Sequence, residues 1–305
     1  MTRIKRIFLY IIAFLIQGTA LAVPSMDCRP LPAGASQQTP KPRYGQGLLF
    51  KLSRPGSQPS HVFGTLHLSD ERLVTLPLEV ARVLDASRSF TMEAMLDERA
   101  IIELSDHLFY QDGTRLSDQL GAALFQRVAS LLARQGIPEP MAQIVKPWGA
   151  YVILSMPPSQ QGLPMDMVLM QRAQTRGASV YGLETVREQA ETLGNMALTD
   201  QVALLKDVVC HYEAAQQLIA EMTSRYLKRD LAGLMVLANR FKLGEEYTEF
   251  MERLLFQRNR RMVKRMAARL AEGNAFIAIG ALHLPGDQGV LALLEQQGYE
   301  VSVVY

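Results

Sequence analysis

The stretch that most constrains the fold is a short apolar run near the C-terminus that ends in a glycine and a histidine. Residues 275–280 form this run, its last residue is Gly280, and His283 follows three positions later. A Pro-Gly pair then stops the strand, residues 287–297 have a helical apolar pattern, and residues 299–305 alternate as a second strand. The sequence therefore predicts a strand, a Gly-x-x-His turn, a helix and another strand in succession.

A second copy of this pattern begins near residue 61. An apolar strand runs into Gly64, Thr65, a leucine and His67, which match the Gly-Ala-Leu-His tetrad of the first stretch. Residues 77–86 follow with a helical apolar pattern, and residues 89–95 alternate as a strand. We interpret the two units as a diverged internal repeat, because both the tetrads and the elements around them correspond.

The two histidines are candidate metal ligands or general bases. A parallel strand delivers the residue after its end to the carboxyl edge of the sheet, where α/β proteins bind ligands. A glycine at that point lets the backbone approach its neighbours closely, and imidazole both binds metals and exchanges protons near neutral pH. The alternative is that His67 and His283 are ordinary polar residues at strand ends, but a matched pair in matched context favours a site.

Three carboxylates also lie where strands end or turn. Glu93 and Glu184 lie within or at the end of apolar strands, where an unpaired carboxylate is costly to bury. Asp166 opens a helix, where it is either a functional residue or a helix cap. The ordinary explanation for the two glutamates is a salt bridge to an arginine, and Arg258, which precedes Asn259 in a helix before the second repeat, is a candidate.

Several other polar or aromatic residues are expected to have structural roles only. The patterns favour a solvated helix face for Arg260 and Arg261, which follow Asn259. The single tryptophan, Trp148, is expected to pack in the core or a loop, and the two helical histidines, His107 and His211, are expected at surface or packed positions.

The N-terminus predicts export. A basic segment precedes the apolar run at residues 7–16, and Ala20-Leu-Ala22 has the small residues of a signal-peptidase site, so residues 1–22 are expected to be removed before Val23. The run is shorter than the ~20 residues that span a bilayer, which leaves an uncleaved anchor as the lesser alternative. The mature protein is expected to be periplasmic or secreted in a bacterium, without stable membrane insertion.

Residues 23–45 are rich in Pro, Gln, Ser and Gly and predict an extended linker. Only two cysteines occur, Cys28 and Cys210, and in an oxidising compartment they form either a disulfide or two unpaired thiols.

The remaining chain predicts one α/β domain. We expect residues 46–305 to form a sheet from the two strand-Gly-x-x-His-helix-strand repeats at the chain ends, with a large helical insertion over about residues 98–270 that contains an apolar strand ending at Glu184. A net charge of +2, with no basic block that carries interleaved aromatics, gives no indication of nucleic-acid binding.

Taken in order, these motifs resemble the TraB/GumN family. That family is related to the TIKI metalloproteases and more distantly to the erythromycin esterase and ChaN-like proteins. The resemblance covers residue 46 to the end and rests on Gly64-Thr-Leu-His67, Lys146-Pro-Trp148, Asp166, Gly182-Leu-Glu-Thr185 with Gln189, Arg258-Asn259 and Gly280-Ala-Leu-His283-Leu-Pro-Gly286.

The resemblance implies a protease that depends on a divalent metal such as manganese, cobalt or zinc. The implied metal ligands are His67, His283 and Glu93, with Arg258 and Asn259 as accessories. Such a metal activates water and polarises a carbonyl, and the substrate is expected to be a peptide or protein. The sequence leaves open which of Glu93 and Glu184 is a ligand and which a general base, and whether Arg258 stabilises an oxyanion or orients a carboxylate. The alternative function is a non-catalytic protein that sequesters a peptide or haem.

Overall fold

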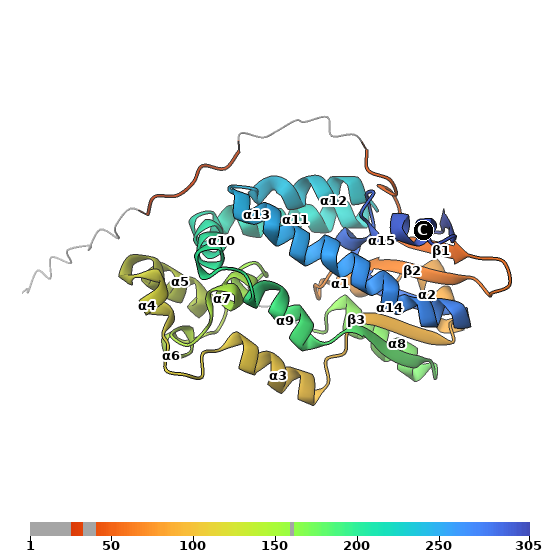
Figure 1. Ribbon diagram of the computed structural model, residues 1–305, viewed down its shortest axis with the longest axis horizontal. Helices are drawn as coiled ribbons and strands as arrows, with labels where there is room; N and C mark the ends of the chain where they lie inside the picture. The colour runs from red at the N-terminus through yellow and green to blue at the C-terminus, as the bar shows by residue number, and fades with distance from the viewer. Residues whose placement is uncertain (1–25, 33–40, 159–161) are drawn as a thin grey trace, which may run out of the picture.

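The computed structural model describes residues 26–32, 41–158 and 162–305, and its core is a single mixed sheet of six strands (Figure 1). The strand order is β4-β3-β5-β2-β1-β6. The strands are β1 (Leu49–Ser53), β2 (Ser60–Thr65), β3 (Ser89–Ala94), β4 (Ser179–Glu184), β5 (Ala275–Gly280) and β6 (Glu300–Val303). Helices surround this sheet, so the predicted α/β class is confirmed.

The carboxyl ends of four strands meet at one edge of the sheet. Strands β2, β5, β3 and β4 are neighbours and parallel, and their registers align Thr65 with Gly280 and Ala94 with Glu184. Strand β1 is antiparallel to both β2 and β6, so β1 begins at the edge where β2 and β6 end. The edge therefore gathers the residues that follow β2 and β5 with those that end β3 and β4.

The two faces of the sheet are covered by different parts of the chain. Successive residues of a strand point to opposite faces. On β2, the Thr65 hydroxyl donates to Asp166 at the start of α8, whereas the Cα of Gly64 faces Ala281 and Leu284 after β5. Helix α8 (Met165–Thr175) therefore lies on one face, and the segment after β5 covers the other.

The helices fill the rest of the chain. Besides α8 they are α1 (Glu71–Val74), α2 (Leu78–Ala86), α3 (Glu98–Leu108), α4 (Leu116–Leu120), α5 (Ala122–Arg134), α6 (Glu139–Ala142), α7 (Pro147–Leu154), α9 (Val186–Gly194), α10 (Leu198–Cys210), α11 (Tyr212–Leu227), α12 (Leu231–Ala238), α13 (Glu245–Met251), α14 (Arg258–Glu272) and α15 (Val290–Gln296). In Figure 1 the sheet lies at one end of the molecule and α4, α5, α6 and α7 at the other. The latter group has its own apolar cluster, shared with α10 and α11.

The middle of the chain is not a purely helical segment beside the sheet. Strand β4 forms one edge of the sheet and pairs with β3 along its whole length. Helices α8 and α14 bury apolar side chains in the same core as the strands, including Leu169 and Met266. Residues 98–270 thus supply a strand and two packed helices to the sheet layer, together with the separate helical cluster.

The helical part of the chain is interrupted at two positions. Between α10 and α11 the helix breaks at His211, whose φ of −116° and ψ of 30° are not helical. Between α13 and α14 a π-helical turn at Glu252–Gln257 lies directly before Arg258. The apolar periodicity of the sequence continues across both positions. It therefore gives no sign that the backbone hydrogen bonds change there.

The N-terminal segment is attached to the helical part rather than free. Cys28 forms a disulfide with Cys210 at the end of α10. Arg29 pairs with Asp207 of α10 and Glu246 of α13, and its carbonyl oxygen lies 2.7 Å from His211 Nε2. The predicted linker is therefore anchored at these residues. The sequence did not predict this anchoring, because charge and disulfide partners far along the chain leave no local pattern.

The predicted signal peptide at residues 1–22 lies outside the described residues. Among the residues that are described, no helix has the length and apolar character that crossing a membrane requires.

Candidate functional site

The edge where the parallel strands end holds the polar residues that the sequence singled out. Glu93 is the penultimate residue of β3, and Glu184 is the last residue of β4. His67 lies two residues beyond β2, and His283 ends a 3₁₀ turn (Ala281–His283) directly after β5. Arg258 reaches this edge from the first position of α14. The fold thus brings five distant residues to one place.

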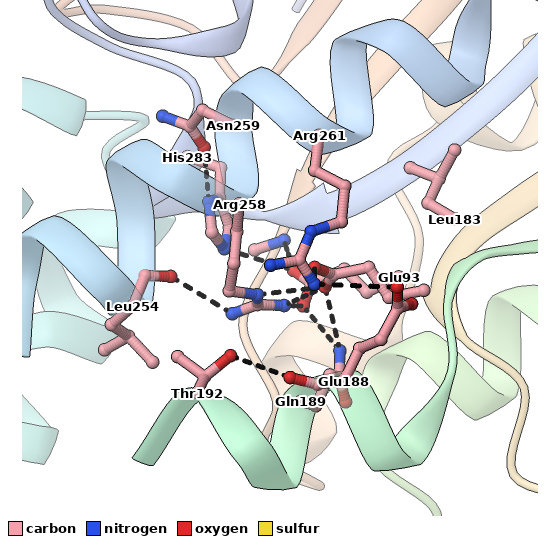
Figure 2. A network of polar contacts seen from close by, with 12 residues as sticks. Glu93, Leu183, Glu188, Gln189, Thr192, Leu254, Arg258, Asn259, Arg261 and His283 are labelled. Atoms are coloured by element: carbon pink, nitrogen blue, oxygen red, sulfur yellow. Dashed lines mark hydrogen bonds and ion pairs between the residues drawn. The ribbon is translucent and has the colours of Figure 1, made fainter. Parts of the chain in front are cut away.

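Arg258 bridges the two glutamates, as Figure 2 shows for its contact with Glu93. Its Nη2 donates to Glu93 Oε2 at 2.5 Å and to Glu184 Oε2 at 2.7 Å, and its Nε donates to Glu184 Oε2 at 2.9 Å. Nη1 donates to the carbonyl oxygen of Leu254 at 3.2 Å. The arginine that we considered for these carboxylates is therefore shared by both of them.

This cluster is buried, and Glu93 within it stays charged. The Glu184 side chain is 0% exposed, and those of Glu93 and Arg258 are 9% and 8% exposed. Burial by itself raises the pKa of Glu93, but the charges of Arg258 and His67 and the Gly280 N–H outweigh it and hold the pKa far below the ordinary glutamate value. A buried ion pair of this kind requires complete hydrogen bonding, because desolvation otherwise exceeds the Coulombic attraction.

His283 is buried and oriented by Asn259. The Asn259 amide donates from Nδ2 to the carbonyl oxygen of Gln288 at 2.8 Å, which leaves its Oδ1 facing His283 Nδ1 at 2.6 Å. Nδ1 must then carry the hydrogen, so the lone pair of Nε2 points toward Glu93 Oε1, 3.6 Å away. Burial lowers the pKa of His283 to about 3, which keeps the ring neutral.

His67 faces the same carboxylate oxygen from the segment after β2. Its Nδ1 lies 2.7 Å from Asp166 Oδ2, and its Nε2 lies 3.8 Å from Glu93 Oε1. The side chain is 55% exposed, which makes it the most solvent-accessible group of the centre. Desolvation lowers the pKa of His67, but Asp166 and Glu93 together raise it to about 9, so the free ring carries a proton at neutral pH.

Asp166 is not a helix cap. It forms no capping hydrogen bond in α8; instead its Oδ1 accepts from the Thr65 hydroxyl at 2.6 Å and its Oδ2 contacts His67. Each histidine of the centre therefore has its Nδ1 held by a side-chain oxygen and its Nε2 directed at Glu93 Oε1.

The two glycines of the tetrads have different roles. A Cβ on Gly64 would lie 2.7 Å from Leu284 Cδ1, so this glycine allows β2 to pack against the segment after β5. A Cβ on Gly280 would lie 3.2 Å from Glu93 Oε1 and 3.4 Å from His67 Nε2, so this glycine leaves the space between those groups open. The Gly280 N–H also donates to Glu93 Oε1 at 2.7 Å.

Two neighbours of the centre were not placed there from the sequence. Gln189 Nε2 lies 3.4 Å from both Glu93 Oε2 and Glu184 Oε2, and Figure 2 shows it beneath Arg258. Arg261 was expected on a solvated face, but its Nη1 lies 3.4 Å from Glu184 Oε1. Helical spacing provides the missing signal, since Arg261 follows Arg258 by three positions and shares its face.

Among the other residues, Trp148 is buried as expected, and Arg260 is exposed and pairs with Glu252. His107 and His211 lie on or between helices, outside the centre. In the part of the chain that the structure describes, no group of three or more His, Cys, Asp or Glu side chains has the arrangement of a metal site.

Fold and site together define a class: an α/β protein with a buried carboxylate–arginine cluster and two oriented histidines where parallel strands end. The chain belongs to the TraB/PrgY/gumN family, whose model matches residues 48–303. The resemblance inferred from the motifs is thereby confirmed.

Individual relatives are distant. The chain is 24% identical over 311 residues to metalloprotease TIKI2 of Danio rerio, a match covering 83% of this chain and 60% of that relative. It is 23% identical over 252 residues to the uncharacterized protein YbaP of Shigella flexneri, covering 80% of this chain and 90% of the relative. It is also 24% identical to a metalloprotease TIKI homolog of Nematostella vectensis, with 87% and 68% covered. No solved structure gives a significant match.

Proposed function

We propose that this protein is an exported hydrolase that depends on a divalent metal and cleaves peptides. One observation carries the proposal: the Nε2 atoms of His67 and His283 face a single carboxylate oxygen, Glu93 Oε1, from two sides. The names of the TIKI relatives support a metalloprotease, although the chain spans about 60% of the length of Danio rerio TIKI2.

The donor atoms fit a divalent cation after a small movement. Ligands about 2.1 Å from a tetrahedral metal lie roughly 3.4 Å apart. The two observed nitrogen–oxygen separations, 3.6 and 3.8 Å, are slightly wider, in keeping with the absence of a preformed site among the described residues. His67 is exposed enough to rotate inward, and Gly280 leaves the intervening space free of side-chain atoms.

The buried pair of His283 and Glu93 is a further argument for a cation. An imidazole lone pair and a carboxylate oxygen repel each other when nothing positive lies between them. Asp166 and Asn259 hold the two Nδ1 atoms in the way that outer-shell residues orient metal-ligating histidines. The donor set of two imidazoles and one carboxylate suits zinc, manganese or cobalt.

The contacts of Glu93, Glu184 and Arg258 indicate a different role for each residue. We assign Glu93 to the ligand role, because its Oε1 faces the Nε2 atoms of both histidines. Glu184 is fully buried and bonded to Arg258, so it positions the arginine rather than contacting water. Every guanidinium nitrogen of Arg258 already donates to a protein oxygen, which favours the carboxylate-orienting role over the oxyanion role. A bound divalent metal would lower the pKa of a coordinated water molecule and polarise the scissile carbonyl.

Export rests on the signal-like segment at residues 1–22. The Cys28–Cys210 disulfide supports it, because such bonds persist in oxidising compartments such as the periplasm.

The test is the metal content of the purified protein. We expect about one equivalent of manganese, cobalt or zinc by mass spectrometry, and loss of most of it in His67→Ala and in His283→Ala. His107→Ala is the matched control, since His107 lies on α3 outside the centre and its variant should keep the metal. The loaded protein should cleave a peptide mixture, and both site variants should not. Failure of the wild type to bind any of these metals would refute the proposal and favour a sequestering protein.

A further inference from the structure

A second feature of the same sheet edge is a pocket with an apolar floor. Its buried lining residues are Leu48, Phe63, Leu73, Met165 and Tyr226. Its more exposed lining residues include Arg72, Thr75 and Leu227, which form its rim. The pocket has about 320 Å³ of space not filled by atoms, part of it open to solvent. It does not contain the histidines or carboxylates described above.

The pocket and the histidine–carboxylate centre share their supporting elements. Phe63 precedes Thr65 on β2 by two residues and points to the same face, and Met165 directly precedes Asp166 at the start of α8. The Tyr226 hydroxyl donates to the carbonyl oxygen of Gly64 at 2.6 Å. The floor of the pocket is thus built on the residues beside those that hold His67.

The strand order places the pocket next to the centre along the edge. Leu48 precedes β1, and its N–H donates to the carbonyl oxygen of Tyr305 at 2.6 Å, so the pocket lies where β2, β1 and β6 meet this edge. The centre lies over β2, β5 and β3. Strands are about 4.8 Å apart, so the two strand spacings between β5 and β1 amount to roughly 10 Å, or about three residues of an extended peptide.

We propose that this pocket binds an apolar side chain of a peptide, about three residues from the bond that the metal centre cleaves. The inference rests on the proposed function for the reaction and adds the substrate class that the site selects. A floor made of Leu, Phe and Met side chains favours an aliphatic or aromatic group, because burying such a group removes apolar surface from water. An acidic side chain there would lose its hydration without gaining a buried cationic partner.

A binding measurement tests the pocket without requiring catalysis. The probes are two fluorescein-labelled octapeptides of Gly and Ser, one with a single Leu and the other with a single Asp at the same position. We expect the metal-free protein to bind the Leu peptide at least tenfold more tightly by fluorescence anisotropy. Leu227→Glu places a charge at the rim and should abolish this preference. Leu198→Glu is the matched control, because Leu198 is similarly exposed, at 43% against 40%, and does not line the pocket.

Each outcome decides one of the two proposals. Equal affinity for the two peptides, or a preference that survives Leu227→Glu, overturns the pocket assignment. Binding of dodecanoate with no binding of either peptide overturns it as well and points to a free acyl chain. A Leu preference in binding, with no cleavage by the metal-loaded protein, retains the pocket and refutes the hydrolase. If cleavage occurs, the cut should fall about three residues from the leucine, and cuts at positions unrelated to the leucine contradict the geometry.

Discussion

At the residue scale, the role of each glutamate in the centre is set by the contacts of its individual oxygen atoms. Glu93 uses Oε2 for Arg258 and Oε1 for the Gly280 N–H and the two imidazoles. Glu184 directs Oε2 at the same arginine. Two glutamates with the same chemistry thus have different roles, because only Glu93 has an oxygen facing the histidines.

Replacing Arg258 should destabilise the fold strongly. Arg258→Met leaves two buried carboxylates without their cation, which costs about 3–5 kcal/mol in the free energy of unfolding at pH 7. Arg258→Lys should restore only part of this, because one ammonium cannot reproduce the paired guanidinium contacts. Urea unfolding measures both. The control Arg260→Met removes an exposed pair with Glu252 and should cost about 1 kcal/mol or less; equal losses in the two methionine variants would contradict the assignment.

Under the proposed function, adding one methyl group at Gly280 should weaken metal binding without unfolding the protein. The backbone of Gly280 has φ −52° and ψ 134°, which any residue adopts, so Gly280→Ala is not strained there. The new Cβ would occupy the space beside Glu93 Oε1 and His67 Nε2. We expect at least tenfold weaker metal binding by isothermal titration, with a nearly unchanged melting temperature. Gly194→Ala, whose Cβ meets only ordinary contacts with Trp148, should bind metal like the wild type.

At the element scale, the junction of β4 with α9 holds Glu184 in position. Thr185 caps α9 in a capping box with Glu188, and Arg265 of α14 donates to both Glu188 oxygens and to the Leu183 carbonyl oxygen. The π-helical turn before α14 adds to this arrangement, because it ends where Arg258 enters the centre. Such turns are frequent at functional sites.

The stability provided by Glu188 should depend on pH. Its hydrogen bonds with Arg265 outweigh desolvation and lower its pKa from 4.5 to about 2. A carboxyl group with a depressed pKa stabilises the folded state above its unfolded value and loses that contribution as the pH falls toward the folded value. Glu188→Gln should therefore cost about 1 kcal/mol at pH 7 and progressively less between pH 4.5 and 2. Urea unfolding across this range measures it, and a constant deficit at every pH would contradict the prediction.

At the scale of the whole molecule, the N-terminal segment joins two helices that are distant in sequence. The disulfide connects residues 182 positions apart, and Arg29 links α10 to α13. Because α13 continues into the π-helical turn and then into α14, this attachment supports the helix that carries Arg258.

Reduction of the disulfide should lower the melting temperature by about 5–10 °C. Closing a loop of this length restricts the unfolded chain, and bonds of this kind typically contribute about 2–4 kcal/mol, which corresponds to several degrees in a chain of this size. Scanning calorimetry with and without a phosphine reductant measures the shift. The Cys28→Ser, Cys210→Ser double variant should melt at the reduced temperature and show no response to the reductant. A response in that variant would mean that the reductant acts elsewhere.

Much of the candidate site could be anticipated from the sequence because it follows strand ends. Apolar runs define β2, β3, β4 and β5, and polar residues placed at the ends of parallel strands must gather at one edge. The matched Gly-x-x-His tetrads marked two such ends. Together with the other motifs they indicated the family, which the match over residues 48–303 confirms. These inferences need only local patterns, since strand and helix periodicity arise from neighbouring residues.

The tertiary structure decided which atoms meet. Arg258 bonds with residues 74 and 165 positions away, and no local pattern shows that one arginine is shared by both glutamates. The partners of the two Nδ1 atoms, the different roles of Gly64 and Gly280, and the pairing of Cys28 with Cys210 likewise depend on packing between distant segments. Periodicity determined that polar groups would reach this edge, whereas side-chain packing across the sheet determined which oxygen faces the histidines and where space remains.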